Sequence, residues 1–174
     1  STIKKIPVVL GEVDIIKSIQ LLPGVTNSGE GTGGFNVRGG AVDQNLVLLD
    51  EAIIYNTSHL LGFFSVFNAD AIKDIKLYKG SIPAKFGGRV SSVLDVRQKD
   101  GNNKAFNLTG GIGSISSRLA AEGPLFKEKG SFLVAGRTSY INLFLKAAGE
   151  ENSLSFYDLN LKSNYNINEN NKLY

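Results

Sequence analysis

The chain has 174 residues, 42% of them hydrophobic, which is enough for one compact domain with its own core and a second, smaller unit. Its 19 basic and 16 acidic residues give a net charge of +3, and they are scattered, so no basic stripe indicates nucleic-acid binding. The absence of Cys excludes disulfides and cysteine-based metal sites. No run reaches the ~18 apolar residues of a spanning helix, so any membrane role requires β-strands.

The first hundred residues predict short helices and strands. A helix begins after Gly11, because Ile15, Ile16, Ile19 and Leu22 share one face before Pro23-Gly24 stops the run. A polar, glycine-rich loop follows from Thr26 to Gly34. Further along, the pattern predicts an extended segment at 35–38, a buried strand over 46–54 turned at the acidic pair 50–51, one helical turn capped by Asn68, and strands at 75–78 and 90–98.

The polar break over residues 99–104 is the predicted domain boundary, and strands dominate after it. Residues 106–122 are expected to form two strands with a reversal near Gly113-Ser114, and residues 141–148 are compatible with a helix. From Tyr157 to Ile167 apolar and polar residues alternate, with tyrosines near both ends of the apolar face. A soluble β-sandwich strand also alternates in this way, but the length and the tyrosines favour a transmembrane strand.

Motifs of enzymes and cofactor sites are weak in this sequence. Gly29 to Gly34 matches G-x-G-x-x-G, but a helix is predicted before it and an extended segment after it, which is the wrong context for a dinucleotide site. His59 is the only histidine, so zinc sites and histidine-based dyads lack partners. Asp50 and Glu51 are adjacent and would face opposite sides of a strand. We therefore expect no enzyme activity, no cofactor and no metal.

Five segments, in this order, carry a family resemblance: Glu12 to Val25, Phe35-Asn-Val-Arg-Gly-Gly40, Val47-Leu-Leu-Asp50, Ile75 to Gly80 and Ala84-Lys-Phe-Gly-Gly-Arg-Val90. Together they resemble the plug domain of TonB-dependent outer-membrane receptors, of the type common in Bacteroidetes-like bacteria. Residues 105–174 look like the first barrel strands of the same family. The resemblance implies an α+β plug domain at residues 1–104, with a small mixed sheet and short helices, followed by antiparallel strands of a truncated transmembrane β-barrel.

The resemblance also implies a function and a set of site residues. The function is gated, TonB-energised uptake of a scarce nutrient, with this chain supplying the pore-blocking plug. Two loops are the candidates for the substrate-facing surface: Asn27, Ser28, Glu30 and Thr32 belong to the first, and Asn56, Ser58 and His59 to the second. In the family, the arginine of the Val-Arg-Gly strand pairs with barrel glutamates, which indicates Arg38, and Lys85 occupies a second basic position.

The expected location is the outer membrane of a Gram-negative bacterium. The expected partners are TonB, through a Ton box upstream of this sequence, outer-membrane lipid around the barrel, and a surface lipoprotein. Two alternatives remain at this stage: a secreted or periplasmic β-rich ligand-binding module without transport activity, and a signal-transducing receptor with a further N-terminal domain. The substrate is not determined by the sequence.

Overall fold

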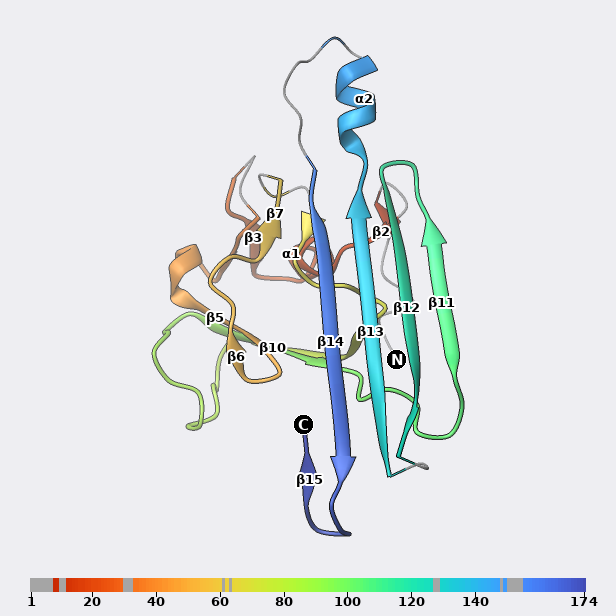
Figure 1. Ribbon diagram of the computed structural model, residues 1–174. Coiled ribbons are helices and arrows are strands. Elements are labelled where there is room, and N and C mark those ends of the chain that lie inside the picture. The colour runs from red at the N-terminus through yellow and green to blue at the C-terminus, as the bar shows by residue number, and fades with distance from the viewer. Residues whose placement is uncertain are drawn as a thin grey trace. The chain divides into compact units, whose positions relative to one another are not determined.

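The computed structural model describes residues 8–9, 12–29, 33–60, 62, 64–126, 129–147, 149 and 155–174 (Figure 1). The chain forms two compact units, the first built around residues 13–98 and the second around residues 99–174. These units divide between Gln98 and Lys99, whereas the domain boundary predicted after Lys104 stays a prediction. None of the described helices has the length and hydropathy needed to cross a lipid bilayer.

The first unit is an α+β structure around a small mixed sheet. Its elements are β1 (Val8–Val9), β2 (Glu12–Val13), α1 (Ile15–Gln20), β3 (Val25–Asn27), β4 (Phe35–Val37), the 3₁₀-helix η2 (Val42–Gln44), β5 (Asn45–Leu49), β6 (Ala52–Ile53), β7 (Ser58–His59), β8 (Phe64–Ser65), β9 (Ile72–Tyr78) and β10 (Ser92–Gln98). The central sheet has the order β6-β5-β10-β9. Strand β10 pairs parallel with β5 and antiparallel with β9, which makes the sheet mixed.

The core of the first unit lies between α1 and the sheet. Apolar residues of α1, β3, β4, β5, β9 and β10 form one buried cluster, and Leu94 and Val96 of β10 are fully buried in it. A second cluster lies on the opposite face of the sheet, where Leu46, Leu48 and Val93 pack with Tyr78 and other side chains. Leu46, Val47 and Leu48 therefore make β5 apolar on both faces, whereas β10 carries the ion pair of Asp95 and Arg97 on the same face as Val93.

Local signals explain the ends of α1 and correct four predictions. The predicted start directly after Gly11 is wrong, because Glu12–Val13 is β2. Asp14 caps the helix, because its carboxylate accepts a hydrogen bond from the Lys17 amide at 3.0 Å. The helix ends at Gln20, and Leu22 is 41% exposed, so its predicted place on the buried face is wrong. The predicted loop from Thr26 is also wrong at its start, because β3 pairs with β4. Asn68 caps a hydrogen-bonded turn and not a helical turn.

The acidic pair Asp50-Glu51 forms the tight turn predicted from the sequence. It joins β5 to β6, and both residues have positive φ, 47° and 74°. This is the backbone pattern of a type I′ hairpin turn, in which Asn-Gly is favoured. The turn is fastened to the central sheet, because the Asp50 carboxylate accepts a hydrogen bond from the Gln98 amide at 3.0 Å.

The second unit is an open sheet of antiparallel strands. Its elements are β11 (Asn107–Ile112), β12 (Ser116–Leu125), β13 (Gly130–Ser139), α2 (Ile141–Ala147), β14 (Tyr157–Asn166) and β15 (Lys172–Leu173). The strands follow one another in chain order. The predicted reversal after β11 is confirmed, since the Gly113 amide donates to the Ser116 carbonyl at 2.8 Å. The helix predicted at 141–148 and the strand predicted from Tyr157 are also present.

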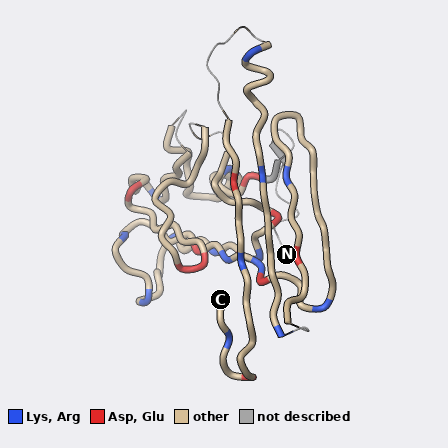
Figure 2. The backbone as a smooth tube through the Cα atoms, viewed as in Figure 1, with Lys and Arg blue, Asp and Glu red and all other residues tan. Residues whose placement is uncertain are grey.

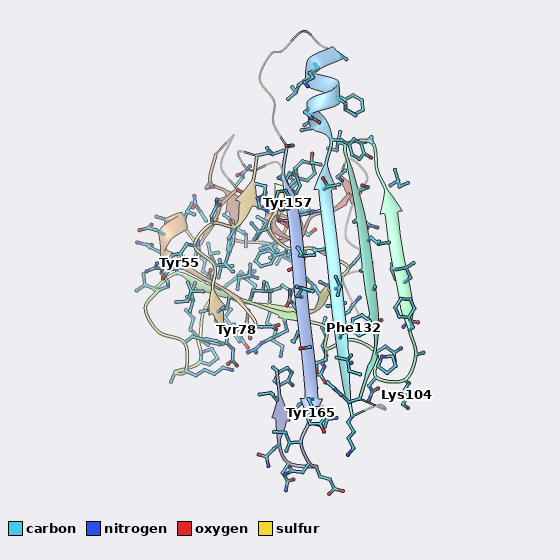
Figure 3. All side chains as sticks on the ribbon, viewed as in Figure 1. Tyr55, Tyr78, Lys104, Phe132, Tyr157 and Tyr165 are labelled. Atoms are coloured by element: carbon cyan, nitrogen blue, oxygen red, sulfur yellow. The ribbon has the colours of Figure 1, made fainter. Side chains whose placement is uncertain are left out.

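The strand register gives the second sheet one apolar and one polar face. Leu119, Gly136 and Leu159 lie side by side on the apolar face, where both leucines are exposed. Figure 3 shows Tyr157 near one end of this sheet and Phe132 and Tyr165 near the other. Aromatic residues at both ends of an exposed apolar band are typical of membrane-spanning strands.

The opposite face of the same sheet carries a buried ion pair. Arg137 and Asp158 are register partners on β13 and β14, and Arg137 Nε donates to Asp158 Oδ2 at 2.9 Å. Their side chains are only 4% and 10% exposed, and the guanidinium also lies over the Phe156 ring. Elsewhere among the residues that Figure 2 colours, basic and acidic side chains are interspersed in each unit.

Candidate functional site

The two loops predicted to face substrate lie against each other in the first unit. Thr57 Oγ1 donates a hydrogen bond to the Gly33 carbonyl at 2.8 Å. A Cβ atom at Gly33 would lie 1.7 Å from Ser58 Oγ, so this close approach requires glycine. Residues 33 and 58 are far apart in sequence, and the structure joins the segments that contain them into one surface.

A cavity of about 40 Å³ lies beneath this contact. It is lined by Asp14, Ile16, Lys17, Gln20, Asn27, Gly33, Ser58, Gly62 and Ser65. The volume is that of a buried water site and is too small for a nutrient molecule. This cavity is therefore a packing gap between α1 and the two loops, and the predicted substrate-facing surface must lie elsewhere on the loops.

Asp14 ties these loops to α1. One oxygen of its buried carboxylate caps the helix, and the other accepts a hydrogen bond from the Ser65 amide of β8 at 2.9 Å. Gln20, on the last turn of the helix, donates to the Gly34 carbonyl at 3.0 Å. Both ends of α1 are thus hydrogen-bonded to the segments that contain the two loops.

Five of the seven residues predicted to face substrate lie in the part of the chain that the structure describes. Asn27 is exposed at the end of β3, and Ser28 follows it half-buried. Asn56 is exposed, and its side chain accepts from the Ser58 amide at 3.2 Å, so it shapes the turn into β7. The half-buried pair Ser58 and His59 forms β7 itself. The other two candidates, Glu30 and Thr32, lie outside the described residues.

A larger concave surface adjoins the second loop and was missed by the sequence analysis. This cavity of about 400 Å³ is lined by Gly34, Phe35, Val42, Asp43, Asn45, Leu46, Val47, Ile53, Ile54, Tyr55, Thr57 and Arg89. Its walls are apolar, and Asp43 and Arg89 add one charge of each sign. Tyr55 is 85% exposed at its margin (Figure 3). The cavity brings together residues within 34–57 and Arg89, and no local sequence pattern indicates that these residues share one surface.

The two predicted locking residues have different surroundings. Arg38 is exposed, and a Cβ atom at Gly80 would lie 3.0 Å from its Nη1, so the guanidinium lies against this glycine. Arg38 lines an open cavity of about 440 Å³ that Lys79 also borders. Lys85 Nζ instead lies 4.7 Å from the centre of the Phe86 ring. Within the described part of the chain, neither Arg38 nor Lys85 forms an ion pair.

Metal chemistry has no candidate site in the part of the chain that the structure describes. No group of three or more His, Asp or Glu side chains there is placed to hold an ion. His59 lies in the hairpin of β7 and β8, so its position is explained by the fold of the loop.

Comparison with known proteins agrees with this architecture. Residues 8–93 match the family model described as the TonB-dependent Receptor Plug Domain. No curated protein matches the sequence. The fold of a small mixed sheet with few helices, followed by antiparallel strands, defines the chain as a plug domain with the beginning of a barrel. Residues 8–93 belong to the plug-domain family of TonB-dependent receptors.

Solved structures of two receptors share the fold. The siderophore receptor PirA from Acinetobacter baumannii matches with a TM-score of 0.55 and 23% identity over 72% of this chain and 22% of its own. A variant of the ferric enterobactin receptor PfeA from Pseudomonas aeruginosa, in complex with enterobactin, matches with a TM-score of 0.59 and 17% identity over 90% of this chain and 29% of its own. The chain thus spans less than a third of these receptors.

Proposed function

We propose that this chain is the plug and first barrel strands of a receptor that takes up a scarce nutrient through a gated, TonB-energised pore in the outer membrane of a Gram-negative bacterium. The observation that carries the proposal is the match of residues 8–93 to the plug family. The two-faced sheet of the second unit supports the membrane location, because an apolar face with aromatic ends suits lipid and a polar face suits a pore.

The substrate-facing surface of the proposed plug consists of the two loops in contact, with Asn27, Ser28, Asn56, Ser58 and His59 as its residues. Its support comes from the hydrogen bond between Thr57 and the Gly33 carbonyl, which holds the loops together. The cavity next to Tyr55 extends this surface and has a volume suited to a small ligand.

The proposed contacts of the plug with its barrel use Arg38 and Lys85. Arg38 is exposed, and within the described residues it forms no ion pair, so its guanidinium is available for a carboxylate. Lys85 lies over Phe86 and keeps its ammonium at the surface. A partly buried pair would be stronger than an exposed one, because water and salt screen it less.

TonB is the proposed energy-coupling partner, and outer-membrane lipid is the proposed environment of the barrel strands. The surface lipoprotein and the relation to Bacteroidetes-like bacteria stay predictions. The two related structures are named as receptors for a siderophore and for ferric enterobactin. At 17–23% identity, the likeness to this chain is one of fold. Ferric siderophores are therefore the first substrate class to test, before cobalamin, glycans and peptides.

The test is an uptake assay in the native bacterium. Deletion of the parent gene is expected to abolish uptake of one nutrient from a panel of ferric siderophores, cobalamin, glycans and peptides, and deletion of tonB is expected to abolish the same uptake. The full-length gene should restore it, and an Arg38→Ala version should restore it less well than a Lys73→Ala control, because Lys73 is an exposed base on β9 away from the proposed contacts. Unchanged uptake of every nutrient in both deletion strains would contradict the proposal.

A further inference from the structure

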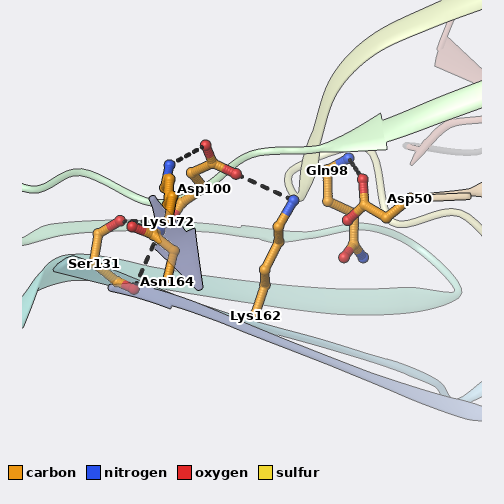
Figure 4. A network of polar contacts seen from close by, with 7 residues as sticks. All are labelled: Asp50, Gln98, Asp100, Ser131, Lys162, Asn164 and Lys172. Carbon is orange, nitrogen blue, oxygen red and sulfur yellow. Dashed lines mark hydrogen bonds and ion pairs between the residues drawn. The ribbon is translucent and has the colours of Figure 1, made fainter. Parts of the chain in front are cut away.

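The segment that follows β10 is bound to the polar face of the second sheet. The Asp100 backbone carbonyl accepts two hydrogen bonds, from Ser131 Oγ of β13 at 2.6 Å and from Asn164 Nδ2 of β14 at 2.7 Å (Figure 4). The two side chains also contact each other at 2.7 Å. Ser131 and Asn164 are only 2% and 6% exposed, so their polar groups need this partner.

The side chain of Asp100 adds two ion pairs to strands of the same sheet. Its carboxylate lies 3.2 Å from Lys162 Nζ of β14 and 2.9 Å from Lys172 Nζ of β15 (Figure 4). Both ammonium groups also lie over the Tyr174 ring, at 5.3 and 4.8 Å from its centre. Burial raises the pKa of Asp100, but its hydrogen bonds to Lys172 and Lys162 and their charges outweigh burial, so the pKa lies below the ordinary value.

The next residue, Gly101, also lies against the second sheet, close to the backbone of β13. A Cβ atom at Gly101 would be 2.3 Å from the Phe132 carbonyl oxygen of β13, and Gly101 has φ of +87°. Any other residue would meet the backbone of β13 and would also strain its own backbone. Asp100 and Gly101 therefore contact three strands of the second unit through a carbonyl, a carboxylate and a close backbone approach.

Such an arrangement differs from an ordinary surface salt bridge. An isolated exposed pair contributes little, because two long side chains must be ordered for a screened attraction. Here one carboxylate serves two lysines, and the Lys162 side chain is only 14% exposed. The backbone carbonyl of the same residue fills the hydrogen-bonding needs of two buried side chains. One residue thus carries charged and neutral contacts that support each other.

We propose that Asp100 is a clamp that fixes the chain after β10 to strands β13, β14 and β15, so that any rearrangement of the plug ends at Lys99. The clamp separates a part of the receptor that can move from a part that stays on the barrel wall. The limit on plug movement rests on the proposed function, since it assumes that the plug rearranges when the receptor is energised. The attachment of Asp100 to the three strands concerns local structure alone, so the attachment and the limit are tested separately.

Limited proteolysis of the full-length receptor in detergent tests the clamp itself. Lys104 is exposed and follows the clamp, and its amide and that of Ala105 donate to Asn102 Oδ1, so trypsin needs local opening to cleave there. Asp100→Asn is expected to speed this cleavage about tenfold, through loss of charge-assisted hydrogen bonds. Lys162→Met, which lies far from the cleavage site in sequence, should speed it about threefold.

Two further variants keep the cleavage test decisive. The double variant Asp100→Asn/Lys162→Met should be cleaved no faster than Asp100→Asn, because both substitutions break the same contact. Glu169→Gln removes one exposed negative charge from the turn after β14 and should leave the rate unchanged. A rate in Asp100→Asn within about twofold of the unmodified receptor, or an equal increase in Glu169→Gln, would overturn the clamp.

Cysteine labelling in cells tests the limit of plug movement. The 174 residues contain no Cys, so Asn103→Cys, in a receptor whose remaining sequence has any Cys replaced by Ser, gives a defined label position beyond the clamp. Its reaction with a maleimide should be the same with and without TonB in the clamped receptor, and should become faster with TonB after Asp100→Asn is added. TonB-dependent labelling in the clamped receptor would refute the limit while leaving the proposed uptake function intact. Equal labelling with and without TonB in both receptors would also refute it.

Discussion

Replacement of Asp14 by Ala is expected to loosen the link between α1 and the substrate-facing loops. The substitution removes the N-cap of α1, which contributes about 0.5–2 kcal/mol. It also leaves the Ser65 amide without the carboxylate that accepts from it at 2.9 Å, at a cost of about 1–3 kcal/mol for a buried donor. The sum is about 1.5–5 kcal/mol, and one factor of ten in an equilibrium corresponds to about 1.4 kcal/mol. Local opening should therefore increase roughly tenfold to a few thousandfold.

Amide hydrogen exchange of the full-length receptor measures this opening. The Lys17 and Ser65 amides should exchange faster in Asp14→Ala, whereas Asp14→Asn, which retains one acceptor oxygen, should expose only one of them. Asp43→Ala is the control, because Asp43 is an exposed acid in η2. Unchanged exchange at Ser65 in Asp14→Ala would refute the reasoning that this carboxylate joins the helix to the loop.

Three other predictions concern the second unit. Asp158→Asn should destabilise the folded receptor by about 3–5 kcal/mol, because the buried Arg137 loses its counter-charge, and heat-dependent gel mobility would report it. The lowered pKa of Asp100 stabilises the clamp above the ordinary carboxyl pKa, so the clamp should weaken as the pH falls below about 4, seen as greater mobility of a spin label on the following segment. Leu161→Arg should cost about 2–4 kcal/mol on the lipid face and reduce the receptor in outer membranes, whereas Asn160→Arg on the polar face should not.

The sequence predicted those parts of the fold that depend on local patterns. The acidic turn at Asp50 and the reversal near Gly113 are present because turn chemistry and alternation act over a few residues. The exposure of Leu22 was missed because α1 ends one residue after Ile19, and the 3.6-residue period does not indicate where packing stops. The pairing of Thr26 with β4 was missed because a polar strand segment resembles a loop.

The candidate site was predictable only in part, for a similar reason. The two loops were found from their composition and from the family resemblance, but their contact joins Thr57 to Gly33, and no local pattern encodes it. The two bonds of Asp14 illustrate the same limit. Its cap on α1 is a contact with the amide of Lys17, three residues further on, whereas its bond to Ser65 spans 51 positions along the chain. The clamp at Asp100 also depends on strands that lie 31 and 64 residues further on.

The position of β10 sets the order in which this protein can fold. It is the last strand of the first unit in the chain, yet it lies inside the sheet, between β5 and β9. Val93 to Val96 must meet residues 46–49, so the parallel pairing closes a loop of more than forty residues. The core of the first unit therefore cannot close before the chain has been made as far as Gln98, and the strands of the second unit follow directly behind it in the sequence. Until then β5 lacks its partner β10, so a nascent chain that stops short of Gln98 keeps that edge of the sheet unpaired.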